Sequence, residues 1–402
     1  MLSVVPDQLH SSVSSAVTIE RIAHGGYGVA HDVAGRVVFV RHAFPGELVS
    51  IRSIATPHER YSFADTVNVL RPSPDRVPAA CPVADRCGGC DFQQLRLEAQ
   101  RRLKLEVIRE QLDRAGVGYP DFEVESLPGD TAGLRWRTRM DYQVGDNGVG
   151  LYAYHTRDVV PLPPQGCLLA ADGGPTPDEL AELATPGVGS IRVAVGSDAT
   201  SILVDGTPVR GPKRLTQWVT YRDNHGIERR RGYQVAAAGF WQVHPGAPGV
   251  FATAVLAGLD PKPGEIALDL YCGSGLFSGA LASCGVRVTG IDSAETAVSA
   301  ARRNVPEAVF RRERVERASL DGSVDLVVLD PSRAGAKRAV VQAVAGLRPR
   351  GVAYVACDPA ALARDLAYFA GFGYQVSSIR AFDAFPMTHH VETIVTLIPG
   401  RK

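Results

Sequence analysis

The spacing of apolar and polar positions changes several times along the chain. Residues 17–70 alternate apolar and polar positions in short runs, which Gly25-Gly26 and Pro45-Gly46 interrupt. A period of two is typical of strands, and such glycine and proline pairs mark turns. The pattern predicts a small antiparallel, OB-like β-barrel of about five strands over residues 12–72, preceded by a frayed leader at residues 1–16.

A proline-rich linker with a group of cysteines is expected at residues 73–120. Within it, residues 94–116 space their apolar side chains three and four positions apart, which predicts a helix that stops at Gly116. Residues 121–236 return to strand-like runs such as SIRVAVG and TSILVDG. A mainly antiparallel, β-rich central domain is therefore predicted there.

Residues 237–402 have a different character, because buried-strand runs alternate with helical stretches. The runs are IALDLYCG, VRVTGID, VDLVVLDP, GVAYVACDP and HHVETIVTLI. Strands that alternate with helices predict an α/β fold with a mostly parallel, Rossmann-like, doubly wound sheet.

Composition narrows the class of protein. Hydrophobic residues make up 45% of the 402 residues and charged residues 21%, which excludes a disordered chain. No apolar run is long enough for a transmembrane helix, and the first residues lack the pattern of a secretory signal, so we expect a cytoplasmic protein. Lys and Arg (43) balance Asp and Glu (43), so a nucleic-acid surface would have to be local. Seven cysteines, an odd number, favour metal or catalytic roles over a disulfide framework.

The run IALDLYCGSG combines a buried strand with a glycine-rich turn. Gly273 and Gly275 would allow a ligand to approach the backbone closely. About 20 residues later the next strand ends in Asp292, where a carboxylate can accept hydrogen bonds from a ribose diol. A dinucleotide fingerprint is missing, so the pattern favours a nucleoside-type ligand, of which S-adenosylmethionine is the obvious one. The alternative is that these glycines serve packing alone.

Further reactive side chains stand where strands end. Asp330 closes VDLVVLD and Cys357 closes GVAYVAC, and ligands bind at the carboxyl ends of strands in such sheets. Cys357 precedes a helix, whose dipole is expected to lower the thiol pKa, with help from Arg364. A soft thiolate suits addition to a conjugated carbon such as C6 of uracil, and the alternative is a buried structural cysteine. Glu392 lies two residues after His390 in a predicted strand, so both face the same side.

A second group of cysteines lies in the linker. Cys81, Cys87 and Cys90 place three thiols in one loop, and Gly88-Gly89 lets the chain wrap an inorganic core. Cys167 is the best remaining fourth ligand. The alternatives are a structural zinc site, which four cysteines also satisfy, and thiols without a common role.

The chain resembles the RNA uracil-C5 methyltransferases, which form 5-methyluridine in bacterial tRNA and 23S rRNA. The matching stretches are FWQVHPGA, LDLYCGSGLFS, GIDSAETAV, DLVVLDPSRAG, YVACDPAALARDL and DAFPMTHHVETIVTL. The resemblance implies a methyltransferase domain at residues 237–402, with Cys357 as the nucleophile and Glu392 as the proton acceptor. It also implies that S-adenosylmethionine contacts Gln242, Tyr271, Asp292 and Asp330.

The same resemblance extends to the other domains. It implies a [4Fe–4S] cluster on Cys81, Cys87, Cys90 and Cys167, and a TRAM-type RNA-binding barrel that carries GGYGVA and FPGELVSIRSI. RNA is the expected partner, with 23S rRNA favoured over tRNA, and no obligate protein partner is predicted. RWRTRMDY is expected to place Arg135, Arg137 and Arg139 on one basic strand face. Lys104, near the start of the predicted helix, belongs to another basic group that phosphates would contact.

The chain departs from the family pattern at five positions, and at two of them Leu276 and His244 stand where an asparagine is common. Ser332 replaces the second proline of DPPR, Asp358 replaces the asparagine of CNP, and Arg314 replaces an adenine-contacting aspartate. An acidic Asp358 would oppose thiolate formation at Cys357. Two other classes therefore compete with an enzyme: a non-catalytic RNA-binding protein, and an iron–sulfur redox sensor on the same scaffold.

Overall fold

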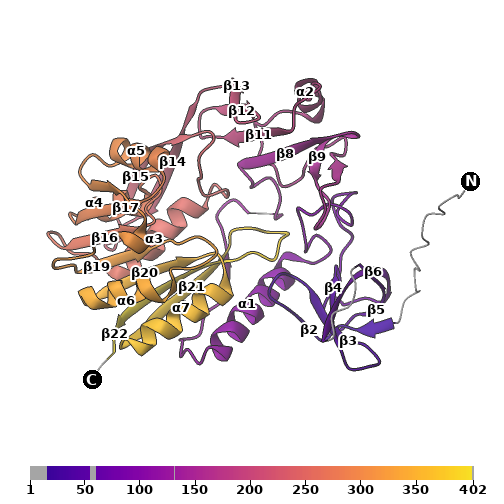
Figure 1. Ribbon diagram of the computed structural model, residues 1–402, viewed down its shortest axis with the longest axis horizontal. Helices are drawn as coiled ribbons and strands as arrows, with labels where there is room; N and C mark the ends of the chain where they lie inside the picture. The colour runs from indigo at the N-terminus through magenta and orange to yellow at the C-terminus, as the bar shows by residue number, and fades with distance from the viewer. Residues whose placement is uncertain (1–15, 55–59, 131, 401–402) are drawn as a thin grey trace, which may run out of the picture.

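A computed structural model describes residues 16–54, 60–130 and 132–400. The predicted leader lies almost wholly outside these ranges, as do residues 12–15 of the predicted barrel. Within the described residues, no helix is long and apolar enough to cross a membrane. Figure 1 shows the N-terminal strands, the central sheet and the C-terminal layers as three adjoining parts, with α1 between them.

The N-terminal domain is one curled sheet in the order β1-β5-β6-β4-β3-β2. Its strands are β1 (Ala16–Thr18), β2 (Arg21–Ile22), β3 (Gly28–His31), β4 (Val37–Arg41), β5 (Leu48–Ser53) and β6 (Tyr61–Arg71). The N–H of Ile19 donates to the carbonyl of Glu47, just before β5, and the N–H of Glu20 donates to the carbonyl of Val29 in β3. The segment between β1 and β2 therefore bonds to two different parts of the sheet. The sheet differs from the expected antiparallel barrel in one respect, because β4 pairs with β6 in parallel.

The predicted linker helix is α1 (Leu97–Arg114). Its buried side chains follow helical spacing, as the pattern predicted, and they include Ala99, Leu103, Ile108 and Leu112. One of them is Lys104, which the sequence placed in an exposed basic group; the structure corrects this, because Lys104 is only 2% exposed.

The central sheet is fully antiparallel, as expected, in the order β10-β9-β8-β11-β12-β13. Its strands are β8 (Arg139–Gly145), β9 (Gly148–Tyr152), β10 (Val159–Pro161), β11 (Ser190–Val195), β12 (Thr200–Val204) and β13 (Thr207–Arg210). A short helix, α2 (Pro177–Leu183), interrupts it and was not predicted. Thr176 and Glu179 form a capping box at its start.

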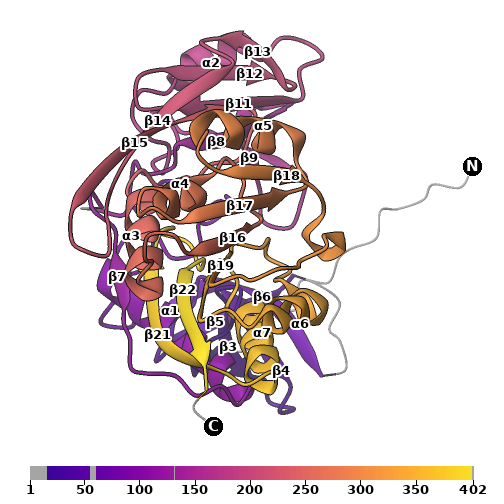
Figure 2. The same cartoon turned by 90° about the vertical axis from the view of Figure 1, so that its left-hand side faces the viewer.

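The C-terminal sheet has the order β18-β17-β16-β19-β20-β22-β21-β7, with neighbours parallel from β18 to β20. Its strands are β7 (Val124–Ser126), β16 (Ile266–Leu270), β17 (Arg287–Asp292), β18 (Val309–Arg312), β19 (Leu326–Leu329), β20 (Gly351–Ala356), β21 (Tyr374–Asp383) and β22 (Glu392–Pro399). Figure 2 shows β18, β17, β16 and β19 side by side. The Rossmann-like, doubly wound α/β class predicted from the sequence is confirmed.

Helices cover both faces of this sheet. They are α3 (Ala247–Leu259), α4 (Leu276–Ala282), α5 (Glu295–Asn304), α6 (Lys337–Leu347) and α7 (Pro359–Gly371), with a short 3-10 turn at Val315–Arg317. Residues on α3, α4 and α5 share one core, and residues on α1, α6 and α7 share the other. Along β20, Ala353 and Val355 enter the first core while Val352 and Tyr354 enter the second, because neighbouring strand residues face opposite sides.

Two segments of the expected central domain pack against the C-terminal layers. Strand β7 pairs with β21 in the C-terminal sheet. The hairpin of β14 (Arg214–Arg222) and β15 (Glu228–Ala236) places Val219 and Tyr233 in the same core as α3. These long-range contacts leave no local pattern in the sequence.

Candidate active site

The glycine-rich turn after β16 holds two glycines with different surroundings. Gly273 has a φ of +52°, and a Cβ at this position would meet no atom within 4 Å. Gly275 has a φ of +90°, but a Cβ there would lie 3.2 Å from Val305 Cγ2. Gly273 therefore borders open space that a ligand can fill, whereas Gly275 allows the turn to pack against Val305 and Ala301.

Asp292 at the end of β17 holds this turn in place. Its Oδ2 accepts a hydrogen bond from the N–H of Gly273 at 3.0 Å, and its Oδ1 accepts one from the N–H of Ala294 at 2.8 Å. Tyr271 precedes the turn in the left-handed region, with a φ of 64°, and its hydroxyl donates to Glu316 Oε1 at 3.4 Å. The structure thus brings Tyr271, Gly273 and Asp292 together.

Two further carboxyl groups lie along the same edge of the sheet. Burial raises the pKa of Asp269 to about 7, although the Ser278 hydroxyl donates to its Oδ2 at 2.5 Å. Its other oxygen, Oδ1, has no hydrogen-bond partner within the described residues. Burial and the carboxylates of Asp269 and Asp292 raise the pKa of Asp330 to about 7. Such a group of acids with raised pKa values is typical of functional sites.

Gln242 comes from a different part of the chain. It is buried in the segment between β15 and α3. The carbonyl of the next residue, Val243, accepts hydrogen bonds from the N–H and the hydroxyl of Thr138, at 2.9 and 2.8 Å. Gln242 therefore lies where the central sheet meets the C-terminal domain.

Cys357, directly after β20, lies beside Glu392, the first residue of the directly paired strand β22. Ala356 of β20 is registered opposite Thr393 of β22, so the next residues in each direction, Cys357 and Glu392, lie opposite each other. Glu392 is 3% exposed. Burial and the nearby Asp330 raise the pKa of Glu392 well above its usual value. A thiol and a buried carboxyl group thus face each other at the sheet edge.

The thiol of Cys357 is not activated in the way the sequence suggested. Burial and the carboxylates of Glu392 and Asp330 raise the pKa of Cys357 to about 12, although Arg333 works in the opposite direction. The predicted lowering by the helix dipole and Arg364 is wrong for the free protein. Arg364 instead bonds to Asp365 and to the carbonyl of Ala334.

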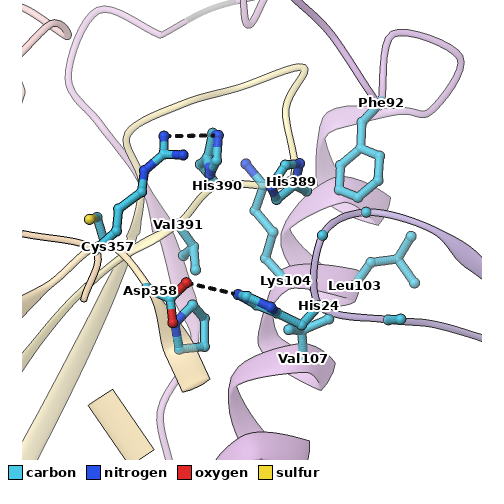
Figure 3. A pocket seen from close by; sticks show the side chains of 15 residues that line it. His24, Phe92, Leu103, Lys104, Val107, Cys357, Asp358, His389, His390 and Val391 are labelled. Carbon is cyan, nitrogen blue, oxygen red and sulfur yellow. Dashed lines mark hydrogen bonds and ion pairs between the residues drawn. The ribbon is translucent and has the colours of Figure 1, made fainter. Parts of the chain in front are cut away.

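Cys357 opens into a cavity of about 150 Å³, here called the Cys357 cavity. Figure 3 shows Cys357, His390, His389, Lys104 and His24 around it. An engineered cavity of roughly 150 Å³ binds benzene, so a space of this size accommodates one planar ring. Its walls come from the N-terminal domain, from α1, and from residues 384–391, which connect β21 to β22 and are called the β21–β22 loop.

Arg333 and His390 form a polar pair in this cavity. Arg333 Nη2 lies 3.3 Å from His390 Nε2. Burial and the charges of His389 and Arg333 lower the pKa of His390 to about 3, so its imidazole is neutral at neutral pH. A neutral imidazole can accept a hydrogen bond from the guanidinium, which leaves further Arg333 N–H groups to contact a ligand.

The β21–β22 loop rests on the loop that carries the cysteines. The N–H groups of Asp91 and Phe92 donate to the carbonyl of Met387 at 2.9 and 3.0 Å. Asp91 Oδ2 lies 2.6 Å from His389 Nδ1. Figure 1 shows the β21–β22 loop reaching toward α1 and the N-terminal strands. The cysteine loop therefore supports the segment that leads directly to Glu392.

The four predicted metal-ligand cysteines occupy one region. Burial raises the pKa values of Cys87, Cys90 and Cys167. Cys81 acts in the same direction on Cys87 and Cys167, and Cys87 and Cys167 do so on Cys90. N–H groups point at the sulfurs: Gly89 N lies 3.4 Å from Cys87 Sγ, and Gln93 Nε2 lies 3.3 Å from Cys90 Sγ. As placed, no group of three His, Cys, Asp or Glu side chains in the described ranges could hold a single metal ion.

The predicted basic strand face does not form. Arg135 has a φ of 61° and Trp136 is buried, and β8 begins only at Arg139, which is itself 8% exposed. The reason is that Arg135 and Arg137 donate their N–H groups to carbonyls of Leu168 and Leu169, just after Cys167. Arg135 and Arg137 line one groove, but Arg139 is buried, so the three arginines do not form a common basic face.

Several residues of the Cys357 cavity were not singled out as site residues. Arg333 lies in the DPSR stretch, which directly follows β19, and this position after a strand end was a local signal for a site residue. His24 gave none and Lys104 was assigned only to a phosphate-contacting basic group, because each reaches the cavity from a domain or helix far away in the sequence.

Comparisons with known proteins agree with this arrangement. Residues 267–351 match a family model described as a methyltransferase domain. The chain is 42% identical to an uncharacterized RNA methyltransferase of Streptomyces avermitilis, with 96% of this chain and 98% of that protein covered. It is 40% identical to an uncharacterized RNA methyltransferase of Streptomyces coelicolor, with 96% and 93% covered.

More distant relatives carry more specific names. The chain is 27% identical to the 23S rRNA (uracil(1939)-C(5))-methyltransferase RlmD of Shewanella halifaxensis, with 96% of each chain covered. The crystal structure of Pyrococcus abyssi tRNA (uracil-54, C5)-methyltransferase in complex with S-adenosyl-L-homocysteine matches with a TM-score of 0.69 and 22% identity. That match covers 95% of this chain and 99% of the other, and it shows a shared fold.

Proposed function

Since the chain belongs to the RNA methyltransferase family, we propose that it methylates carbon 5 of a uracil in RNA with S-adenosylmethionine. The observation that carries this proposal is the pair of Cys357 and Glu392, which face each other at the end of β20. A nucleophilic thiol beside a buried carboxyl group is suited to a reaction that needs covalent activation and then proton removal.

Cys357 acts as the nucleophile. Its thiol releases a proton to solvent water, and the sulfur forms a bond to C6 of uracil, which pushes the C5–C6 π electrons into an enolate over C5, C4 and O4. Carbon 5 thereby becomes electron-rich enough to accept a methyl group. Arg333 is the cavity residue whose charge favours the thiolate, and its guanidinium can donate toward the enolate oxygen.

Glu392 completes the reaction. After methylation, carbon 5 carries both a methyl group and its original proton. The Glu392 carboxylate takes this proton, the C6–S bond breaks, the C5=C6 bond reforms and Cys357 is released. Because burial raises the pKa of Glu392 well above its usual value, Glu392 is a strong base once it is ionised.

The turn after β16 fits S-adenosylmethionine. Gly273 borders open space, and Asp269 Oδ1 is a buried acceptor without a partner among the described residues. We infer that Gln242, Tyr271, Gly273, Gly275, Asp292 and Asp330 form the binding region, in which Gly275 acts by packing the turn. When bound, S-adenosylmethionine supplies a methyl group on an electrophilic sulfonium.

We further propose that Cys81, Cys87, Cys90 and Cys167 hold a [4Fe–4S] cluster. Four thiols in one region with N–H donors at their sulfurs fit an iron–sulfur core. A single zinc ion would need all four sulfurs about 2.3 Å from one point, and the side chains as placed do not converge so closely. The contacts between the cysteine loop and the β21–β22 loop support a structural role for the cluster.

The RNA target is the finer part of the proposal. We favour 23S rRNA over tRNA, with the relative from Shewanella halifaxensis as support, and we propose that the N-terminal sheet is a TRAM-type RNA-binding module. The target base has to leave the stack to reach a cavity that holds one ring. An RNA substrate also implies a cytoplasmic location.

The test uses anaerobically purified protein, S-adenosylmethionine, and unmodified 23S rRNA and tRNA transcripts. After digestion to nucleosides, mass spectrometry should detect 5-methyluridine with the wild type and not with Cys357→Ala. Glu392→Gln should instead accumulate a protein–RNA adduct that survives denaturing electrophoresis, because elimination is blocked. Cys284→Ala, a partly buried thiol elsewhere in the same domain, is the matched control and should stay active. Methylation that persists in Cys357→Ala would overturn the covalent mechanism.

A further inference from the structure

A glycine-rich turn of the N-terminal domain forms part of the wall of the Cys357 cavity. His24, Gly25 and Gly26 connect β2 to β3 and line the cavity together with Cys357. A Cβ on Gly26 would lie only 2.8 Å from the Cβ of His389, so the turn packs directly against the β21–β22 loop. The site is therefore built from two domains that are more than 300 residues apart in the chain.

One side chain of this turn contacts the residue next to the proposed nucleophile. His24 Nε2 lies 3.2 Å from Asp358 Oδ2, and Figure 3 shows the imidazole pointing at this carboxylate. The other oxygen, Oδ1, accepts a hydrogen bond from the N–H of Ala361 at 2.8 Å and so caps α7. Asp358 is thus held between the helix and the N-terminal domain.

The carboxylate of Asp358 opposes ionisation of its neighbour. It contributes to the raised pKa of Cys357, after burial, Glu392 and Asp330. The hydrogen bond to Asp358 raises the pKa of His24, against the effect of burial. Burial alone would raise the pKa of Asp358, but His24 and the cap hydrogen bond keep this pKa low. The pair therefore favours an imidazolium next to a carboxylate.

We propose that His24 is a positioning residue, whose imidazolium pairs with Asp358 and offsets the negative charge beside the Cys357 sulfur. This inference rests on the proposed role of Cys357 as the nucleophile. It gives the N-terminal domain a part in the chemistry, because that domain supplies the cation that pairs with Asp358, in addition to the charge of Arg333 from the catalytic domain. It also explains how an acidic residue is tolerated directly after the reactive cysteine.

Other charged groups that line the cavity have partners of their own. Lys104 pairs with Asp383, Arg333 contacts His390, and His389 pairs with Asp91. On the N-terminal side, Arg21 of β2 pairs with Glu110 of α1. Any dependence of Cys357 reactivity on pH thus has contributions from these groups, and substitutions at His24 and Asp358 are needed to isolate the pair.

The test measures Cys357 itself, without RNA or S-adenosylmethionine. The full-length protein is alkylated with iodoacetamide at several pH values, and the Cys357 peptide is quantified by mass spectrometry. His24→Gln should slow alkylation of Cys357 by about 3- to 10-fold at pH 6.5, where the raised pKa of His24 keeps its imidazolium populated, and this corresponds to half to one unit in the thiol pKa. His24→Lys keeps a positive charge and should retain most of the wild-type rate. His225→Gln, an exposed histidine in the β14–β15 turn, should have no effect.

The double variant separates charge from structure. Asp358→Asn keeps a good helix cap but removes the carboxylate, so it should alkylate at least as fast as the wild type. His24→Gln combined with Asp358→Asn should then match Asp358→Asn alone. If the double variant stays as slow as His24→Gln, or if His24→Gln does not slow alkylation, the inference is overturned. If His24→Gln does not fold, His24→Asn replaces it, and the alkylation rates of Cys357 are compared in the same single and double variants.

Activity gives a second measurement that distinguishes this inference from the proposed function. His24→Gln should lower the kcat of methylation about as much as it lowers alkylation, and leave the KM for S-adenosylmethionine unchanged. If the wild type methylates no uracil while the alkylation pattern holds, the proposed function fails and the His24–Asp358 coupling stands.

Discussion

The ammonium of Lys104 lies 2.5 Å from the carboxylate of Asp383, and both side chains are buried. Lys104 Nζ also donates to the carbonyl of Phe385 at 3.1 Å. The pair thereby ties α1 to the point where β21 ends and the β21–β22 loop begins. Burial lowers the pKa of Lys104, while Asp383 opposes this effect. The linker helix is thus fastened to the segment that carries Glu392.

Removing one member of this pair should be costly. Lys104→Met leaves the Asp383 carboxylate buried without its cation, and we expect a loss of about 3–5 kcal/mol in the free energy of unfolding. Chemical denaturation followed by circular dichroism measures it. The matched control is Lys262→Met, because Lys262 pairs with Asp260 at 2.6 Å on an exposed surface, where less than about 1 kcal/mol is expected. Equal losses in both variants would contradict this account.

The rate of methylation should rise with pH through the neutral range. Cys357 has a pKa of about 12 in the free protein, so its thiol is mainly protonated near pH 7, and burial raises the pKa of Glu392 well above its usual value. Each must lose a proton during the reaction, and the ionised fraction grows tenfold per pH unit below the pKa. We expect kcat/KM to increase steadily from pH 6 to pH 9. A maximum below pH 7.5 would show that another group limits the reaction.

Local patterns in the sequence identified the elements and most strand-end residues. The helical spacing of α1 and the apolar runs of β16, β17, β19 and β20 were sufficient to predict these elements. Helix α2 was missed, although Thr176 and Glu179 carry a capping signal. The placement of β7 beside β21 could not be predicted, because the pairing joins segments about 250 residues apart.

The parts of the site that the sequence did not reveal depend on contacts between domains. Neither the position of His24 nor the burial of Lys104 follows from neighbouring residues. The basic face of RWRTRMDY failed for a similar reason, since the backbone around Arg135 pairs with the segment after Cys167. The pKa of Cys357 was misjudged mainly because the sequence does not reveal the burial of its thiol, which raises this pKa most, ahead of the carboxyl groups of Glu392 and Asp330.

The two glycines of the turn after β16 should respond differently to substitution. Gly273→Ala adds a methyl group in open space at a φ of +52°, so we expect a stability loss of only about 1 kcal/mol. The same methyl group would occupy the space proposed for the ligand, and binding of S-adenosyl-L-homocysteine should weaken at least tenfold. Gly275→Ala strains the backbone and approaches Val305, so it should lower Tm more than Gly273→Ala does. Calorimetric titration and thermal unfolding measure both effects, and unchanged binding in Gly273→Ala would place the ligand elsewhere.

Gln100 connects the cysteine loop to the β21–β22 loop. This fully buried side chain donates from Nε2 to the carbonyls of Phe92 and Leu95, at 3.0 and 2.9 Å, and accepts at Oε1 from the N–H of Met387 at 2.8 Å. Gln100→Leu leaves these backbone groups without their partner, each at a cost of about 1–3 kcal/mol. We expect a lower Tm and a kcat for methylation reduced at least tenfold.

The loss in Gln100→Leu should be specific to the half of the site that the β21–β22 loop forms. S-adenosyl-L-homocysteine binding should change less than threefold, because the hydrogen bonds of Gln100 go to Phe92, Leu95 and Met387 and not to the turn after β16. Gln111→Leu, a partly exposed position on the same helix, is the matched control and should leave kcat unchanged. If Gln100→Leu lowers cofactor affinity as much as kcat, the variant has disturbed the whole domain. A selective loss of kcat would instead support transmission from the cysteine loop to Glu392 through Met387.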